Sequence, residues 1–373
     1  MKRCVWLLLL CVLLPTVSLA QETTYTLLDA GGSVITYYCG ECSEGDEYIS
    51  GDNQHFRVTK VEESAKTAQV EALGAITLPD VSWLDENGTL PVSASGKAKK
   101  IAVYCTHSDE SYEKGDGKSS SEKRGGIYDV AKAFAAGLEK LGVSVERSDA
   151  THHPHDAGAY RRSRQTAVAL LKNTPDAIFD LHRDGIPDPD EYAVTLGSTK
   201  ASKVRLLVGR GNQNNESNLS LAKQIKAVGD KVYPGLIKDI YMGKGSYNQD
   251  LSPRSVLLEF GTHTLSKERV LASTGPMSEV IYKTLYGGVV GSAGASDVSG
   301  SSAAQSKGSA TAEGTVEDNV SSGSGIVWLI VALVAGLLVF GFLAAGSGKG
   351  GMNKFKRSFS EMTGGLFGKK PRS

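Results

Sequence analysis

The chain has 373 residues, of which 40% are hydrophobic and 22% are charged. This length and composition suffice for one or two folded domains, and they exclude a chain disordered throughout and a disulfide-held miniprotein. Lys plus Arg and Asp plus Glu both number 41, but the first 20 residues carry +2 and residues 346–373 carry +6, so the body between them carries −8. An acidic body without a basic patch argues against nucleic acid as a partner, because phosphate affinity comes from clustered cations.

The N-terminal residues 1–20 have the pattern of a secretory signal peptide. Lys2 and Arg3 precede an apolar run from Val5 to Leu14, and small residues ending at Ala20 provide a cleavage site. An uncleaved N-terminal anchor is the alternative interpretation. A signal peptide here predicts that the chain after residue 20 lies outside the cytoplasm.

The C-terminal part has the pattern of a membrane anchor. Residues 326–345 carry no charge, and twenty residues of helix span about 30 Å, enough to cross a bilayer. Residues 291–325 before them are rich in Ser and Gly and predict a flexible linker. The basic tail at 346–373 predicts a cytoplasmic C-terminus. The sequence therefore predicts a single-pass protein of the cell membrane with an extracytoplasmic body.

Residues 21–95 predict a small β-rich N-terminal domain, because short runs of β-branched and aromatic residues alternate with Gly and Asn turns. No catalytic group of residues is visible in this segment. Its Cys39 and Cys42 predict either a local disulfide or two unreacted thiols, since no second Cys pair is present to complete a structural zinc site. The predicted strands are 24–28, 33–38, 55–61 and 68–73.

Residues 96–290 alternate strand-like and helix-like patterns, which predicts an α/β fold with a mainly parallel sheet flanked by helices. Apolar residues at helical spacing over 126–141 are the clearest example. The predicted strands are 101–105, 143–146, 177–181, 192–196, 204–209 and 255–260, and the other predicted helices are 159–172, 219–232 and 277–286.

Three of these predicted strands end in polar residues of the kind that bind metals. His107 and Glu110 follow the first strand, His182 follows the third, and Glu259 lies within the last. Parallel strands bring their carboxyl ends to one edge of a sheet, where sites form. Two His, a carboxylate and one further acid make up a catalytic zinc site with an open position. Burial in the run Leu257–Phe260 raises the pKa of a carboxyl, which suits a general base.

Structural roles are the alternative for each of these residues taken alone. A single His after a strand is commonly a hydrogen-bonded structural residue, and Glu110 could be a solvated loop acid. The joint occurrence at equivalent strand ends favours metal binding. A further group, His152, His153 and His155, lies in a loop stiffened by Pro154 and predicts a surface loop or a substrate rim.

The chain resembles the stage II sporulation protein P family, zinc-dependent N-acetylmuramoyl-L-alanine amidases of endospore formers. The resemblance extends over about 45–265, and its most specific parts are the His-Arg-Asp block at 182–184 and the Asn-Gln-Asp-Leu-Ser-Pro block at 248–253. It implies a catalytic domain like that of the cell-wall zinc amidases over 96–290. The chain departs from the family where Cys105 stands at a position that often holds His.

The resemblance also implies residue roles. By position, His107 and His182 look like zinc ligands, and Glu259 looks like the catalytic acid/base. Glu110 fits best as the third ligand, because zinc carboxypeptidases use the same His-x-x-Glu…His arrangement. Arg183 would stabilise the oxyanion or anchor a stem-peptide carboxylate, with a structural ion pair to an acid such as Asp184 as the alternative.

The implied reaction is hydrolysis of the amide between the lactyl group of N-acetylmuramic acid and L-alanine in peptidoglycan. The implied setting is remodelling of the septal wall during sporulation and engulfment, with a lytic transglycosylase and other sporulation membrane proteins as partners. Two alternatives stay open at this point. One is a zinc carboxypeptidase or endopeptidase acting on stem peptides, and the other is a catalytically inactive wall-binding module.

Overall fold

The computed structural model describes residues 23–84, 98–156 and 158–287. The predicted signal peptide (1–20), linker (291–325), membrane helix (326–345) and basic tail (346–373) lie outside these residues. Within the described ranges, none of the helices combines the length and the apolar character needed to span a membrane.

Most described strands belong to one 11-stranded sheet, in the order β2-β1-β5-β4-β3-β12-β11-β13-β8-β6-β7, and β9 and β10 form a separate hairpin. The strands are β1 Thr24–Leu28, β2 Val34–Cys39, β3 Glu47–Ile49, β4 Gln54–Glu62, β5 Thr67–Ala75, β6 Lys100–Tyr104, β7 Ser144–Arg147, β8 Ala177–Asp184, β9 Ala193–Leu196, β10 Thr199–Ser202, β11 Val204–Gly209, β12 Ile237–Gly243 and β13 Ser255–Thr262. The helices are α1 Glu113–Asp116, α2 Ile127–Lys140, α3 Ala159–Leu171, α4 Asn215–Val232 and α5 Lys267–Tyr286, with short 3₁₀ turns at Pro189–Glu191 and Gln249–Leu251.

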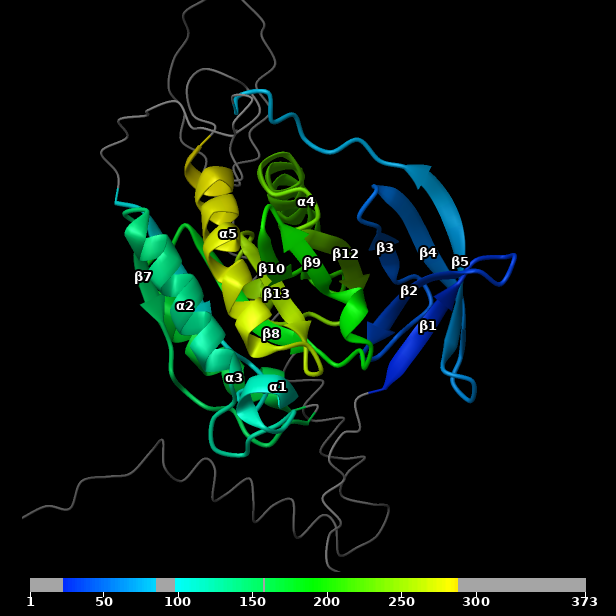
Figure 1. The fold of residues 1–373 in the computed structure, drawn as a ribbon, viewed down its shortest axis with the longest axis horizontal. Helices are drawn as coiled ribbons and strands as arrows, with labels where there is room; N and C mark the ends of the chain where they lie inside the picture. Colours follow the sequence, from blue (N-terminus) through cyan, green and yellow to red (C-terminus); the bar gives the residue numbers. More distant parts are fainter. Residues whose placement is uncertain (1–22, 85–97, 157, 288–373) are drawn as a thin grey trace, which may run out of the picture. The chain divides into compact units, whose positions relative to one another are not determined.

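The predicted α/β architecture is confirmed for residues 98–287, with one difference. The pairs β7–β6, β6–β8, β8–β13 and β11–β12 are parallel, but β11 runs antiparallel to β13. Helices α2, α5 and α4 lie along one face of this part of the sheet (Figure 1). Their apolar sides pack on alternate residues of the strands, such as Phe179 and Phe260. This face holds the main hydrophobic core, because every second strand residue points to it.

The opposite face has two separate covers. Helix α3 packs on β6 and β8 through a small cluster that includes Tyr104 and Leu170. The N-terminal strands pack on β11, β12 and β13 through another cluster that includes Tyr38 and Tyr241. The rings of these two tyrosines are stacked 3.7 Å apart. The candidate site lies in the space between α3 and the N-terminal strands.

The N-terminal strands continue the same sheet. The four predicted runs form β1, β2, β4 and β5, and the short β3, which the pattern did not predict, pairs antiparallel with β12. From there the sheet turns back, so that the edge strand β2 lies over the face of β11. The Arg205 guanidinium on β11 donates to the main-chain carbonyl of Tyr37 on β2 at 2.9 Å. Cys42, beside these strands, and Cys105 are buried thiols, so the structure contains no Cys39–Cys42 disulfide.

Further elements differ from the sequence prediction, among them β12, β9 and α5. Strand β12 was not predicted, because Lys238 and Asp239 interrupt its apolar pattern, and both are buried in ion pairs. The predicted strand at 192–196 forms the hairpin with β10 instead of joining the main sheet. Helix α5 begins ten residues earlier than predicted, at Lys267, where Ser266 caps it by accepting a hydrogen bond from the N–H of Arg269.

Candidate metal and active site

Two segments bring the predicted metal-binding residues together. His107 and Glu110 lie in the loop after β6, and His182 lies near the carboxyl end of β8, the strand next to β6. The loop is held by main-chain hydrogen bonds, among them one from the N–H of Ile127 at the start of α2 to the carbonyl of Glu110. The carboxyl-edge arrangement predicted from the sequence is therefore the one observed.

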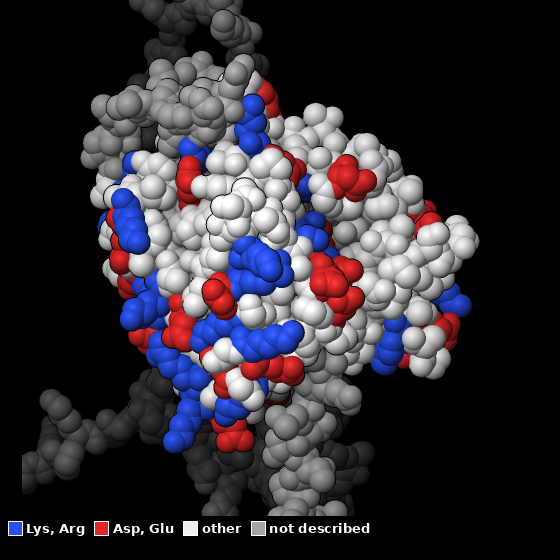
Figure 2. All heavy atoms as spheres, in the orientation of Figure 1, with Lys and Arg blue, Asp and Glu red and all other residues white. Residues whose placement is uncertain are grey.

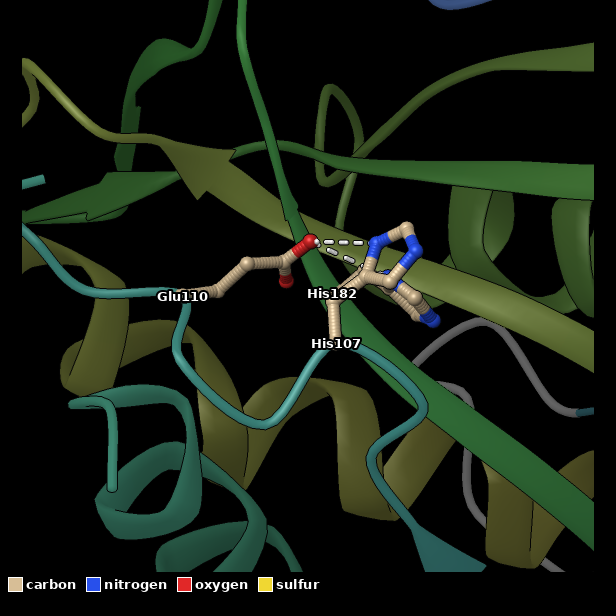
Figure 3. Close-up of side chains that lie close together, drawn as sticks. All are labelled: His107, Glu110 and His182. Atoms are coloured by element: carbon tan, nitrogen blue, oxygen red, sulfur yellow. Dashed lines mark hydrogen bonds and ion pairs between the residues drawn. The ribbon is translucent and has the colours of Figure 1, made fainter. Parts of the chain in front are cut away.

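The three side chains converge on one carboxylate oxygen. Glu110 Oε1 lies 3.0 Å from His107 Nδ1 and 3.2 Å from His182 Nδ1, as the dashed lines in Figure 3 show. One potential ligand atom from each residue lies within 4.8 Å of the other two. Burial raises the pKa of Glu110, but the two imidazoles outweigh this effect and hold that pKa well below its ordinary value.

This donor set fits a zinc ion. Two imidazole nitrogens and one carboxylate oxygen are the protein ligands of many catalytic zinc sites. A metal-binding His usually has its second ring nitrogen against a carboxylate, which fixes the ring orientation. His182 Nε2 lies 3.1 Å from Asp180 Oδ1, although it is not aligned as a hydrogen bond. Glu110 Oε2 is fixed by the main-chain N–H of Arg183 at 2.8 Å.

Glu259 lies beside this cluster on β13. It is the register partner of His182 in the parallel pair of β13 and β8, so the two side chains share a face of the sheet. Burial and then the nearby charge of Asp184 raise its pKa well above the ordinary value, and the opposing effect of Arg205 is smaller. A carboxyl of raised pKa next to a metal site is suited to take up and release a proton.

Arg183 lies between the two ligand-bearing segments. Its guanidinium donates to the main-chain carbonyls of Ser119 at 3.0 Å and Asp184 at 3.4 Å, and its own N–H holds Glu110. The side chain is buried. These contacts fix the loop that follows Glu110 to strand β8.

A cavity of about 1070 Å³ opens over the cluster. One wall comes from α3 and the loop after β12, with Tyr160 and Tyr247, and another comes from the N-terminal strands, with Tyr25 and Tyr38. The sequence pattern had assigned no functional residue to the N-terminal segment.

On the face drawn in Figure 2, Lys and Arg side chains lie interspersed with Asp and Glu.

The loop with three His residues is divided by the fold. His152 is buried and bonds the Cys105 carbonyl and the Thr166 hydroxyl, both at 2.9 Å. His155 lines the cavity, and its ring stacks on that of His107 at 3.8 Å. His155 therefore lies at the rim of the candidate site, and His152 stabilises the structure beside it.

Sequence reasoning missed the residues that surround the ligands and Glu259. Asp180 and Asp184 flank His182 at the two-residue spacing that places all three on one face of β8, and this spacing could have identified them. Arg205 stands in the apolar strand β11, and a charge in such a run indicates a buried partner. Tyr192, whose hydroxyl oxygen lies 3.3 Å from Glu259 Oε2, gave no such indication, because this contact depends on the fold.

Residues 41–282 match the model of stage II sporulation protein P. The chain belongs to this family. A family member of Bacillus subtilis (strain 168), also described as stage II sporulation protein P, is 32% identical over 192 residues, which cover 46% of this chain and 47% of the relative. The chain thus spans about half the length of the relative that it matches.

Solved structures of several amidases have partial similarity to this chain. The CwlD amidase of Clostridioides difficile, solved in complex with the GerS lipoprotein, has a TM-score of 0.35 and 17% identity, over 50% of this chain and 95% of that one. AmiC2 of Nostoc punctiforme has a TM-score of 0.32 and 17% identity, over 51% and 97%. Ami1 of Mycobacterium smegmatis has a TM-score of 0.33 and 18% identity, over 51% and 99%.

Proposed function

We propose that the protein is a peptidoglycan hydrolase, a zinc-dependent N-acetylmuramoyl-L-alanine amidase that cleaves the amide between the lactyl group and L-alanine. Membership of the stage II sporulation protein P family supports this proposal. The observation that carries it is the convergence of His107, Glu110 and His182 on one point, with the buried Glu259 in register beside His182.

In this proposal His107, Glu110 and His182 hold the zinc ion, which when bound supplies Lewis acidity and lowers the pKa of water. Glu259 takes the proton of the attacking water and returns it to the departing amine of L-alanine. Its raised pKa allows it to keep this proton between the two transfers. Arg183 orients Glu110 through its main-chain N–H. Its guanidinium holds the loop at Ser119.

The proposal extends to location and setting. The predicted signal peptide (1–20), membrane helix (326–345) and basic tail (346–373) would give a single-pass protein of the cell membrane with its catalytic part outside and its C-terminus in the cytoplasm. The flexible linker (291–325) would let this part reach a thin layer of wall while anchored. Membership of the family supports a role in sporulation. The proposed setting is remodelling of the septal wall, with a lytic transglycosylase and other sporulation membrane proteins as proposed partners.

The test uses one preparation of the full-length chain. Its zinc content is measured, it is incubated with purified peptidoglycan, and the products are identified by mass spectrometry. We expect about one zinc per chain and free stem peptides that begin with L-alanine. Single released amino acids would indicate a carboxypeptidase instead. A folded, zinc-supplied sample that binds no zinc and releases no peptide would leave only a wall-binding role.

A further inference from the structure

A row of buried polar side chains crosses four neighbouring strands and ends at the candidate metal cluster. Arg205 on β11 is the register partner of Asp239 on β12 and also of Glu259 on β13. Glu259 is in turn the register partner of His182 on β8. Register partners point to the same face of a sheet. All four are buried, so each charge in the row needs a partner within the protein.

Arg205 has its donors engaged by groups other than Glu259. Nε and Nη2 donate to the two carboxylate oxygens of Asp239 at 2.7 and 2.9 Å, and Nη1 donates to Asp184 Oδ2 at 3.0 Å. Nη2 also donates to the main-chain carbonyl of Tyr37 at 2.9 Å. Glu259 Oε2 lies 4.0 Å from Nη1, which is too long for a hydrogen bond.

Tyr192 makes the direct contact with Glu259. Its Oη lies 2.6 Å from Asp184 Oδ2 and 3.3 Å from Glu259 Oε2. A phenol carries a single proton, and the shorter distance assigns this proton to Asp184, which Arg205 also holds. The remaining lone pair of Oη then faces Glu259. When Glu259 carries a proton on Oε2, this O–H can donate a hydrogen bond to the lone pair, and the proton stays on Glu259. The hydrogen bond holds the carboxyl group in one orientation.

We propose that Tyr192 is a positioning residue for Glu259, and that Asp184, Arg205 and the carbonyl of Tyr37 hold Tyr192 in place. This inference rests on the proposed role of Glu259 as the proton carrier. It assigns a part in catalysis to β2, because the Tyr37 carbonyl completes the surroundings of Arg205. The N-terminal strands then form part of the active site as well as a wall of the cavity.

The experiment compares Tyr192→Phe with Tyr128→Phe in the full-length, zinc-loaded chain. Both tyrosines are almost fully buried, and the Tyr128 hydroxyl on α2 donates to the Ala150 carbonyl at 2.6 Å, away from Glu259. Both variants lose one buried hydroxyl. For Tyr192→Phe we expect kcat on peptidoglycan to fall about tenfold, the loss expected for one hydrogen bond to the proton carrier, with KM within about twofold.

Measurements of Tm and zinc content distinguish a positioning role of Tyr192 from a general structural effect of its substitution. The two variants should retain the same zinc content and stay folded with a lowered Tm, while only Tyr192→Phe loses kcat. Equal kcat in both variants, or a matching loss of zinc and kcat in Tyr192→Phe, would overturn the inference.

Arg205→Lys provides a second test. Lysine keeps the positive charge but cannot contact Asp239, Asp184 and the Tyr37 carbonyl together, so kcat should fall at least as much as in Tyr192→Phe. A folded Arg205→Lys protein with the wild-type kcat would contradict the inference. If this variant does not fold, the comparison of Tyr192→Phe with Tyr128→Phe still tests whether Tyr192 positions Glu259.

The same series distinguishes this inference from the proposed function. A wild-type protein that releases no stem peptides, or a Glu259→Gln variant with wild-type turnover, would refute the proposed function and with it the inference. An active wild type, an inactive Glu259→Gln variant and an unchanged Tyr192→Phe variant would refute the inference alone.

Discussion

The two faces of strands β8 and β13 differ in composition beside the candidate site, because alternate residues of each strand point to opposite faces. One face carries Phe179, Leu181, Leu258 and Phe260 under α2, α4 and α5. The other carries Asp180, His182, Asp184 and Glu259 in the candidate site. The difference teaches that the two-residue period of a strand separates stability from chemistry within a single segment. Substitutions on the two faces should therefore affect different measurements.

The largest expected loss of stability comes from the apolar face. Phe179 is fully buried and meets the ring of Phe134 edge-on at 6.3 Å. Phe179→Ala should lower the free energy of unfolding by about 3–5 kcal/mol, because it removes apolar contacts and leaves a cavity. Urea unfolding measures this change. Val168→Ala, at an exposed position on α3, is the control and should change stability by less than about 0.5 kcal/mol. Similar effects for the two variants would contradict the assignment of the core to this face.

The largest expected loss of activity comes from the polar face. Glu259→Gln should lower kcat about 10²–10⁴-fold, because the amide cannot carry the proton between water and amine. It should leave zinc content and Tm nearly unchanged, since the carboxyl, whose pKa is raised by burial, is replaced by a neutral group of the same shape. Peptide release, metal analysis and thermal unfolding check the three parts. A large drop in Tm would show instead that Glu259 contributes mainly to the stability of the fold.

Substitution of Asp180 should change the affinity for zinc more than it changes stability or kcat. Asp180→Asn keeps an oxygen that can accept from the Thr106 N–H, which bonds Asp180 Oδ1 at 2.8 Å, but it removes the negative charge beside His182 Nε2. Zinc affinity should fall about 10–100-fold, as expected for the group that orients a metal-binding His. Competition with a chelator measures the affinity. Asp176→Asn, at the start of the same strand region, is the control, and an equal change there would refute the role of Asp180.

The smallest effect is expected at a partly exposed ion pair. Arg164 on α3 donates to both carboxylate oxygens of Asp250, at 2.8 and 2.6 Å, and this contact lowers the pKa of Asp250. Because the folded-state pKa is lowered, the stabilisation is present above the unfolded value of about 3.9 and is lost as pH falls through the folded value. Asp250→Asn should cost less than about 1 kcal/mol at pH 7. Urea unfolding at pH 7 and at pH 3 should show this difference shrinking, and a difference that grows in acid would refute the sign.

Local sequence patterns predicted the elements that are mostly apolar or whose apolar residues recur at a regular period. The helix predicted over 126–141 is observed as Ile127–Lys140, and the strand predicted over 204–209 has the observed bounds. Strand β12 was missed because its Lys238 and Asp239 resemble surface residues. Their burial depends on Arg205 and Glu191, which lie at least thirty positions away in the chain. A window along the sequence contains no information about such partners.

The candidate site could be predicted in part for a similar reason. His107, Glu110, His182 and Glu259 were identifiable because parallel strands carry their carboxyl ends to one edge. Tyr192 and Arg205 were not, because their relation to Glu259 depends on strand order and register. The signal peptide, linker, membrane helix and tail lie outside the described residues and stay predictions.

Sequence patterns predicted the alternation of strands and helices over 96–290, the family, and the residues of a metal site. The position of β2 over the face of β11, and its connection through Arg205 to the surroundings of Glu259, follow from the folded structure alone. The physical reason is that hydrophobic period and turn residues are local properties of the chain. The burial of a charge is settled only when strands distant in sequence bring its partner to within hydrogen-bonding distance.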